Sequence, residues 1–134
     1  MRRQFTLAEP DQRFLDSLRL PWETLREGND LWVMIHDHPV PSGYDREFTT
    51  IAIKIEAGYP DSQLDMAYFC PGLSRRDGKP IPQSDSNAPL DGKTYQRWSR
   101  HRTAQNPWIP GEHCLETHMD LVRDWLRREF ERRP

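Results

Sequence analysis

The segment EFTTIAIKIEA, residues 47–57, constrains the fold of this chain more than any other stretch. Ile51, Ile53 and Ile55 alternate with other residues, so they would lie on one face of a strand with Lys54 on the other. Such alternation is typical of a half-buried strand rich in β-branched residues. The sequence therefore predicts a sheet whose isoleucine face points into the core.

Segments on both sides of this strand predict its neighbours. AEPDQRFLDSLRL, residues 8–20, has a proline at an early helical position and predicts a short amphipathic helix that Pro21 stops. WETL and DLWVMIHDH predict a hairpin because turn residues in REGND separate them. MAYFC predicts another short strand, which ends at Pro71. The first half of the chain is thus expected to hold one helix and an antiparallel meander.

The second half contains one long stretch without periodicity and one clear helix. Residues 72–93 are rich in Gly, Pro, Ser, Asp and Asn and predict a long irregular loop. A helix is expected from about Glu112 to Arg132, because its apolar residues follow helical spacing and charged residues occupy the outer face. The predicted fold is α+β in a single domain, 1–134: an N-terminal helix, a meander of three to four strands, a long irregular crossing and a C-terminal helix.

Composition argues against several classes of function. The 19 basic and 21 acidic residues give a net charge of −2, and only the run at 97–102 is basic, which disfavours a nucleic-acid or membrane partner. Two cysteines are too few for a disulfide framework, and Cys70 is expected in the core. The start of the chain lacks the apolar run of a signal peptide, and no stretch approaches the length of a membrane span. We expect a cytoplasmic protein.

Two short motifs, in this order, resemble the ubiquitin-conjugating enzyme (UBC) fold. The Tyr-Pro at 59–60 follows the long strand, as in that fold, and WIP at 108–110 matches the Trp-x-Pro that opens the helix after the active-site loop. Together with PSGYDR, LDMAYF and RWSRH, they resemble a bacterial branch, prokaryotic family E, over about residues 10–130. The resemblance implies a UBC-like domain that works with a ubiquitin-like protein, a ThiF/MoeB-like activating enzyme and a JAB-type peptidase of the same pathway.

The chain departs from the UBC pattern at the catalytic positions. It lacks the His-Pro-Asn tripeptide of that family, because its own His38-Pro39 lies before the long strand. The loop ahead of Trp108 contains no cysteine, and Ser99 stands at about the place where the family cysteine is expected. The resemblance therefore supplies a scaffold and leaves the nucleophile open.

Ser99 is the first candidate nucleophile. A ubiquitin-like protein activated as an adenylate is an acyl donor that a hydroxyl can accept when an adjacent base activates it. His101 would be that base in an extended segment, where residues two apart face the same side. Arg100 and Arg102 would stabilise an oxyanion or attract an acidic partner surface. In the alternative, Ser99 and its arginines form a solvated loop anchored by Trp98.

Cys114 is the reserve nucleophile. A thiol at the start of a helix has a stabilised thiolate, and His118 lies one turn further on, where it could act as a base. The alternative is a small buried side chain, since Leu115 begins the apolar stripe. A zinc site is a third interpretation, because Cys114 and His118 share a helix face while His36 and His38 share a strand face. No CxxC or HExxH motif supports it, and we predict neither a metal nor another cofactor.

Two acidic residues near these candidates receive no role. Asp65 and Asp91 could contribute an acid, but carboxylates in such loops usually cap turns or are solvated. The sequence as a whole predicts a conjugating enzyme that accepts the activated C-terminus of a ubiquitin-like protein and transfers it to an amine. The alternative is a non-catalytic UBC-like adaptor that binds the ubiquitin-like protein or the activating enzyme, which the missing tripeptide and the missing loop cysteine favour.

Overall fold

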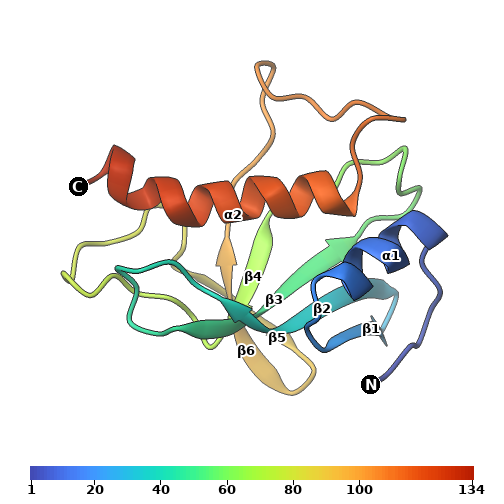
Figure 1. Cartoon of the computed structure of the whole chain (residues 1–134), viewed down its shortest axis with the longest axis horizontal. Coiled ribbons are helices and arrows are strands. Elements are labelled where there is room, and N and C mark those ends of the chain that lie inside the picture. The colour runs from blue at the N-terminus through green and yellow to red at the C-terminus, as the bar shows by residue number, and fades with distance from the viewer.

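Two helices and six strands form an α+β fold in the computed structural model, which describes residues 1–134 (Figure 1). All strand pairs are antiparallel, and the sheet has the order β1-β2-β3-β4-β6-β5. In chain order the elements are α1 (Glu9–Ser17), β1 (Trp22–Glu27), β2 (Asp30–Pro39), β3 (Phe48–Ile55), β4 (Ala67–Cys70), β5 (Ser86–Leu90), β6 (Lys93–Trp98) and α2 (Leu115–Arg132). The expected α+β class, with a helix near each end of the chain, is confirmed.

The expectation of three to four strands is wrong, because the sheet has six. The additional hairpin, β5–β6, begins inside the 72–93 stretch that was expected to be irregular. Its turn is Asp91-Gly92, whose φ angles of 54° and 74° are the left-handed pair of a two-residue hairpin turn. Asn87 and Pro89 obscure β5 in the sequence, since both residue types are rare in strands. Pro89 is tolerated because β5 is an edge strand.

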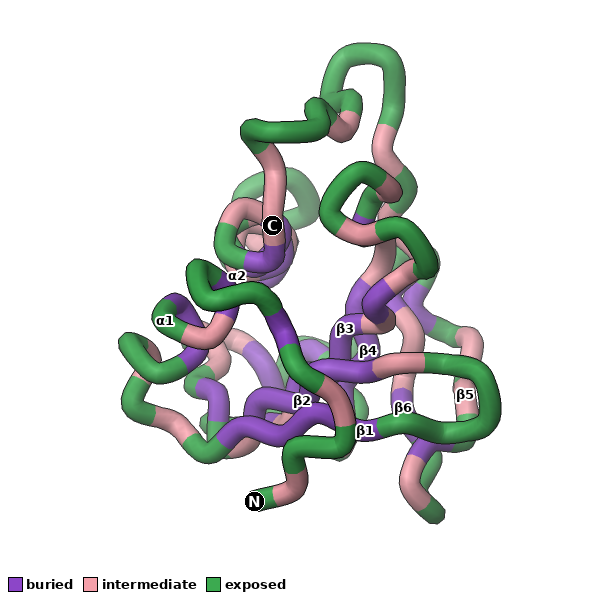
Figure 2. Tube along the Cα trace, turned by 90° about the vertical axis from the view of Figure 1, so that its right-hand side faces the viewer, coloured by how far each residue is buried: buried purple, intermediate pink, exposed green.

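Helix α2 covers one face of the sheet through the apolar stripe that the sequence predicts (Figures 1 and 2). Four residues of the stripe are at most 1 % exposed: Leu115, Met119, Val122 and Leu126. They share one buried cluster with the isoleucines of β3, so the isoleucine face points inward as expected. The helix begins at Leu115 rather than at about Glu112, because Cys114 has an extended backbone and caps it.

The opposite face of the curled sheet is also partly buried. A second cluster gathers there from β1 to β6: Leu25, Trp32, Met34, Ala52, Tyr68, Leu90 and Tyr95. Within it the rings of Trp32 and Tyr68 meet edge to face, with centroids 4.9 Å apart. Two covered faces explain the continuous buried run at 32–35 in β2, which alternation alone would not predict.

The outer edge of β1 pairs with the start of the chain. The Gln4 N–H donates to the carbonyl of Thr24 (3.0 Å), and the Thr24 N–H donates to the carbonyl of Arg2 (3.1 Å). Arg2 also forms ion pairs with Glu23 (2.9 Å) and Asp91 (2.6 Å), which tie this segment to β1 and to the β5–β6 turn. Glu23 therefore keeps its charge, since hydrogen bonds from Arg2 above all, and from His36, lower its pKa to about 2.

Between β6 and α2 the chain leaves the sheet and projects beyond α2, as the orange segment of Figure 1 shows. Much of this segment is exposed, and Trp108 anchors it. The Trp108 Nε1–H donates to the carbonyl of Pro60 (3.0 Å), and the Arg102 guanidinium lies over the Trp108 ring at 4.8 Å. Neither helix of the protein has the length and apolar character that a membrane crossing requires.

Replacing Leu126 with alanine tests the docking of α2. Leu126→Ala is expected to lower the free energy of unfolding by about 2–5 kcal/mol, because it removes buried methyl groups and leaves a cavity. Leu121→Ala is the matched control: this leucine is half-buried on the same helix, and less than half of that loss is expected. Equilibrium urea denaturation measures both variants. Equal losses would contradict the central position of Leu126 in the core.

Candidate functional site

Ser99 lies where the chain leaves β6, and its backbone is held on both sides. The preceding Trp98 is fully buried and packs on Phe69, with ring centroids 5.2 Å apart. The Ser99 N–H donates to the carbonyl of Gln83 (2.8 Å), in the segment that leads to β5. The Ser99 side chain is half-buried and lines a cavity of about 400 Å³. Trp98 anchors the segment in the core, as the alternative of a solvated loop also expects, and Ser99 itself is half-buried.

The cavity beside Ser99 has walls of excess positive charge. It lies between the end of β6 and the second half of α2, and four arginines and His101 line it together with two carboxylates. The arginines are Arg100, Arg128, Arg132 and Arg133, and the carboxylates are Asp124 and Glu129. A cavity with this balance attracts a negatively charged group or stabilises one that forms inside it.

Arg100 is the arginine next to Ser99, as the sequence places it. Its guanidinium lies 4.9 Å from the centroid of the Trp98 ring and 4.0 Å from Glu129. It also donates to the carbonyl of Pro82. Burial, and then the nearby Arg133, lower the pKa of Arg100, although an arginine remains a cation at neutral pH. Arg100 therefore presents a fixed positive charge to the Ser99 cavity.

Glu129 explains why so many arginines tolerate one another here. Its carboxylate is fully buried and accepts from Arg75 (3.1 Å) and Arg133 (2.6 Å). Burial alone would raise the pKa of Glu129, but the hydrogen bonds from Arg133 and Arg75 outweigh it and hold the pKa below its ordinary value. Glu129 is thus an ionised anchor for the cluster and is not free to act as an acid.

His101 does not form the hydrogen bond with Ser99 that an extended segment predicts. Its Nδ1 bonds instead to Oδ2 of Asp65 (2.9 Å), in the loop between β3 and β4. The prediction of a direct Ser99–His101 hydrogen bond is wrong, because Asp65 draws the ring toward itself. His101 nevertheless lines the same cavity as Ser99.

Arg102 is not brought to Ser99. Its Nε donates to the carbonyl of Leu64 (3.2 Å), and its Nη2 donates to Nδ1 of His118 (3.3 Å). It lines a different hollow of the surface, one that it shares with His113. Stabilisation of a negative charge at Ser99 therefore depends on Arg100 and on the arginines of α2 that line the cavity.

Cys114 caps α2, close to the helix start that the sequence predicts. It is half-buried, and its N–H donates to Oγ1 of Thr117 (2.8 Å). His118, its expected base, is 1 % exposed and donates from Nε2 to the carbonyl of Met66 (2.8 Å). Burial lowers the pKa of His118 to about 4, so the ring is neutral at pH 7. Both ring nitrogens of His118 are engaged in structural bonds, and neither is free to activate the Cys114 thiol.

The start of α2 is fastened by the tyrosine of the Tyr-Pro turn. The Leu115 N–H donates to the hydroxyl of Tyr59 (2.7 Å), which donates in turn to the carboxylate of Asp11 in α1 (2.9 Å). Burial raises the pKa of Asp11, and the Tyr59 hydrogen bond lowers it in part. This chain of bonds gives the Tyr-Pro motif a structural role next to Cys114.

Comparison with known proteins decides the family. The family model described as prokaryotic E2 family E matches residues 7–129, nearly the whole chain. The chain belongs to prokaryotic E2 family E. Searches of the curated proteins and of the solved structures find no significant match. Membership of an E2 family indicates a role in ubiquitin-like conjugation, with a ubiquitin-like protein and an activating enzyme as general kinds of partner.

The four ligands of the zinc interpretation do not form a group in this family E protein. His36 bonds to Glu23 (2.7 Å) and Thr50 (3.0 Å), while His38 bonds to the carbonyl of Pro39 (2.8 Å). No three His, Cys, Asp or Glu side chains lie close enough together to hold one ion. His36 thus ties β2 to its neighbours β1 and β3.

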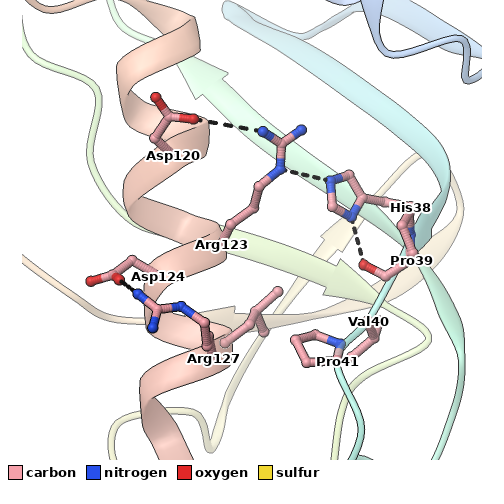
Figure 3. A pocket seen from close by; sticks show the side chains of 9 residues that line it. His38, Pro39, Val40, Pro41, Asp120, Arg123, Asp124 and Arg127 are labelled. Atoms are coloured by element: carbon pink, nitrogen blue, oxygen red, sulfur yellow. Dashed lines mark hydrogen bonds and ion pairs between the residues drawn. The ribbon is translucent and has the colours of Figure 1, made fainter.

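A second cavity, of about 470 Å³, lies on the other side of α2, between the helix and the end of β2 (Figure 3). His38 points toward it, and its Nε2 accepts from Nε of Arg123 (3.3 Å). The two arginines that line it are paired with aspartates of the same helix, Arg123 with Asp120 (3.6 Å) and Arg127 with Asp124 (2.6 Å). With its charges paired and no candidate nucleophile, this cavity offers less chemistry than the Ser99 cavity.

Sequence reasoning missed the contribution of α2 to the candidate site. Arg128 and Arg132 were expected only as the outer face of an amphipathic helix, and Arg133 lay just beyond its expected end. Helical spacing does not tell which outer residues face a loop. Asp65 was considered and given no role. The positive charges of the 97–102 run were a usable signal for a cationic site. One of them, Arg100, lines the cavity and lies 4.0 Å from Glu129.

The buried neutral His118 predicts a loss of stability in acid. Its pKa is about 4 in the folded chain and about 6.5 when unfolded, so between these values the unfolded chain binds a proton that the folded chain does not. The free energy of unfolding therefore falls as the pH drops through this window. Between about pH 7 and about pH 5 the wild type should lose about 2 kcal/mol more than His118→Gln, which keeps an N–H donor for Met66. Urea titrations at both pH values measure this difference, and identical losses would contradict it.

Proposed function

We propose that this family E protein is a ubiquitin-like-protein conjugating enzyme, built as a single UBC-like domain, with Ser99 as its acyl carrier. The observation that carries the proposal is the place of Ser99, which lines a cationic cavity directly after the buried Trp98. In the UBC resemblance this is about the position of the family nucleophile ahead of Trp108. Family membership supports the pathway, and the cavity supports the choice of residue.

The first step would be acyl transfer from the activated C-terminus of the ubiquitin-like protein. A ThiF/MoeB-like enzyme supplies this C-terminus as an acyl adenylate. The Ser99 Oγ attacks the carbonyl carbon, the new C–O bond forms, and the bond to AMP breaks. The hydroxyl proton passes to a base, for which His101 is the candidate in the cavity. Arg100 stabilises the negative charge that develops on the carbonyl oxygen.

The second step would release the carrier. The nitrogen of an acceptor amine attacks the ester carbonyl, the bond to Ser99 Oγ breaks, and the oxygen regains a proton. The product is an amide, and the serine is free for another cycle. A JAB-type peptidase in the same bacterial pathway would reverse the modification by hydrolysing that amide.

One observation favours the alternative of a non-catalytic adaptor. His101 pairs with Asp65 rather than with Ser99, so no side-chain base contacts the Ser99 hydroxyl directly. An adaptor would use the cationic cavity to bind an acidic surface of the ubiquitin-like protein or of the activating enzyme. The two functions differ in one measurable property: only the conjugating enzyme forms a covalent bond with the ubiquitin-like protein.

An adduct assay separates these functions. The chain, its activating enzyme, the ubiquitin-like protein and ATP are combined and analysed by intact mass. We expect an adduct that resists reductant, yields to hydroxide and is lost in Ser99→Ala, because an oxyester has these properties. Cys114→Ala is the matched control and should retain the adduct.

Two other outcomes would contradict the assignment of Ser99. An adduct that reductant removes and that disappears in Cys114→Ala would move the carrier to the start of α2. Binding of the ubiquitin-like protein without any adduct would establish the adaptor instead.

A further inference from the structure

Three successive residues between β3 and β4 bond to two side chains of the segment that follows Ser99 and to one side chain of α2. The carbonyl of Leu64 accepts from Arg102 (3.2 Å), the carboxylate of Asp65 bonds to His101 (2.9 Å), and the carbonyl of Met66 accepts from His118 (2.8 Å). The loop 64–66 thus fixes three side chains at once, and His101 alone among them lines the Ser99 cavity.

Asp65 is itself fixed in place. Its Oδ1 accepts the N–H of Met66 (3.1 Å), while its Oδ2 faces Nδ1 of His101. The Asp65 side chain is 18 % exposed, whereas that of His101 is 65 % exposed. Met66 has φ 58°, a left-handed conformation that a residue other than glycine holds only when its surroundings require it. The carboxylate is therefore the rigid member of the pair and the imidazole the accessible one.

This geometry sets the proton position on the ring. A carboxylate accepts hydrogen bonds only, so Nδ1 of neutral His101 must carry the proton that it shares with Asp65. Nε2 then holds a free lone pair, and no group of the protein bonds to it. An imidazole oriented in this way is prepared to accept a proton from a nucleophile.

We propose that Asp65 is a positioning residue, which holds His101 with its proton on Nδ1 and so makes Nε2 the general base of the Ser99 cavity. The proposal deepens the function proposed above and rests on it. It also reconciles the missing Ser99–His101 hydrogen bond with catalysis, because the bond to Asp65 prepares the base that accepts the Ser99 proton when the hydroxyl attacks the acyl donor. The acyl donor would be an activated carboxylic ester or adenylate.

A chemical probe tests this without the partner proteins. With 4-nitrophenyl acetate, Ser99 Oγ would attack the acetyl carbon, 4-nitrophenolate would leave, and the serine proton would pass to His101 Nε2. The rate of acetylation of Ser99 is followed by peptide mass in the full chain. We expect Asp65→Asn and His101→Gln to lower this rate at least about tenfold, since general-base catalysis contributes about 10²–10⁴-fold.

Asp61→Asn is the matched control, an exposed carboxylate of the same loop whose side chain forms no hydrogen bond, and it should leave the rate unchanged. Equal acetylation in Asp65→Asn and wild type would overturn the proposal. So would a wild type whose Ser99 is never acetylated. Acetylation that depends on Asp65, combined with no adduct in the full pathway, would instead leave this proposal standing and remove the carrier function.

A spectroscopic measurement separates positioning from folding. Nitrogen-15 chemical shifts of His101, recorded well above the ordinary histidine pKa of about 6.5, report which nitrogen carries the proton. The wild type should show the proton on Nδ1. In Asp65→Asn the amide oxygen should turn to the Met66 N–H and the amide NH₂ to His101, which moves the proton to Nε2. An unchanged proton position in a folded Asp65→Asn would overturn the proposal.

Discussion

The packing of one helical stripe against one strand face organises this protein. The apolar residues of α2 meet the isoleucines of β3, and the buried Trp98 at the end of β6 belongs to the same cluster. Because Trp98 is inside, Ser99 emerges at the border between core and cavity rather than at the tip of a loop. The second half of α2 then lies opposite, and its outer arginines become the cavity wall. The packing of the core thus determines where the candidate site lies.

Two histidines of the same region illustrate how burial divides roles. His118 lies on the buried face of α2, has both nitrogens bonded and is neutral at pH 7, so it serves structure. His101 is two-thirds exposed and has one nitrogen bonded, so it remains available for chemistry. Both donate a hydrogen bond to the same short loop, His118 to Met66 and His101 to Asp65. Residue type alone does not tell the two apart, because the difference arises from which of them faces the core.

Local patterns predicted the parts of the fold that local physics controls. The isoleucine alternation of β3 and the stripe of α2 could be read directly, since each reflects one buried face. The β5–β6 hairpin could not be read from strand propensity, because Pro89 and Asn87 oppose it, although its Asp91-Gly92 turn was a usable signal. Ser99 was proposed from its position ahead of Trp108 and Arg100 as its neighbour, and the two residues line one cavity. The Asp65–His101 pair was not predicted, since it joins residues 36 positions apart in the sequence, near the paired ends of β4 and β6.

Both edges of the sheet are protected, and this bears on how a partner chain can be recognised. Residues 2–4 already occupy the outer edge of β1, and Pro89 removes a donor from the outer edge of β5. An extended tail therefore finds no free row of backbone groups with which to continue the sheet. Discrimination between the tails of different partner chains would then depend on the charge and shape of surface side chains. Substitutions at the surface could change this specificity while the scaffold stays the same.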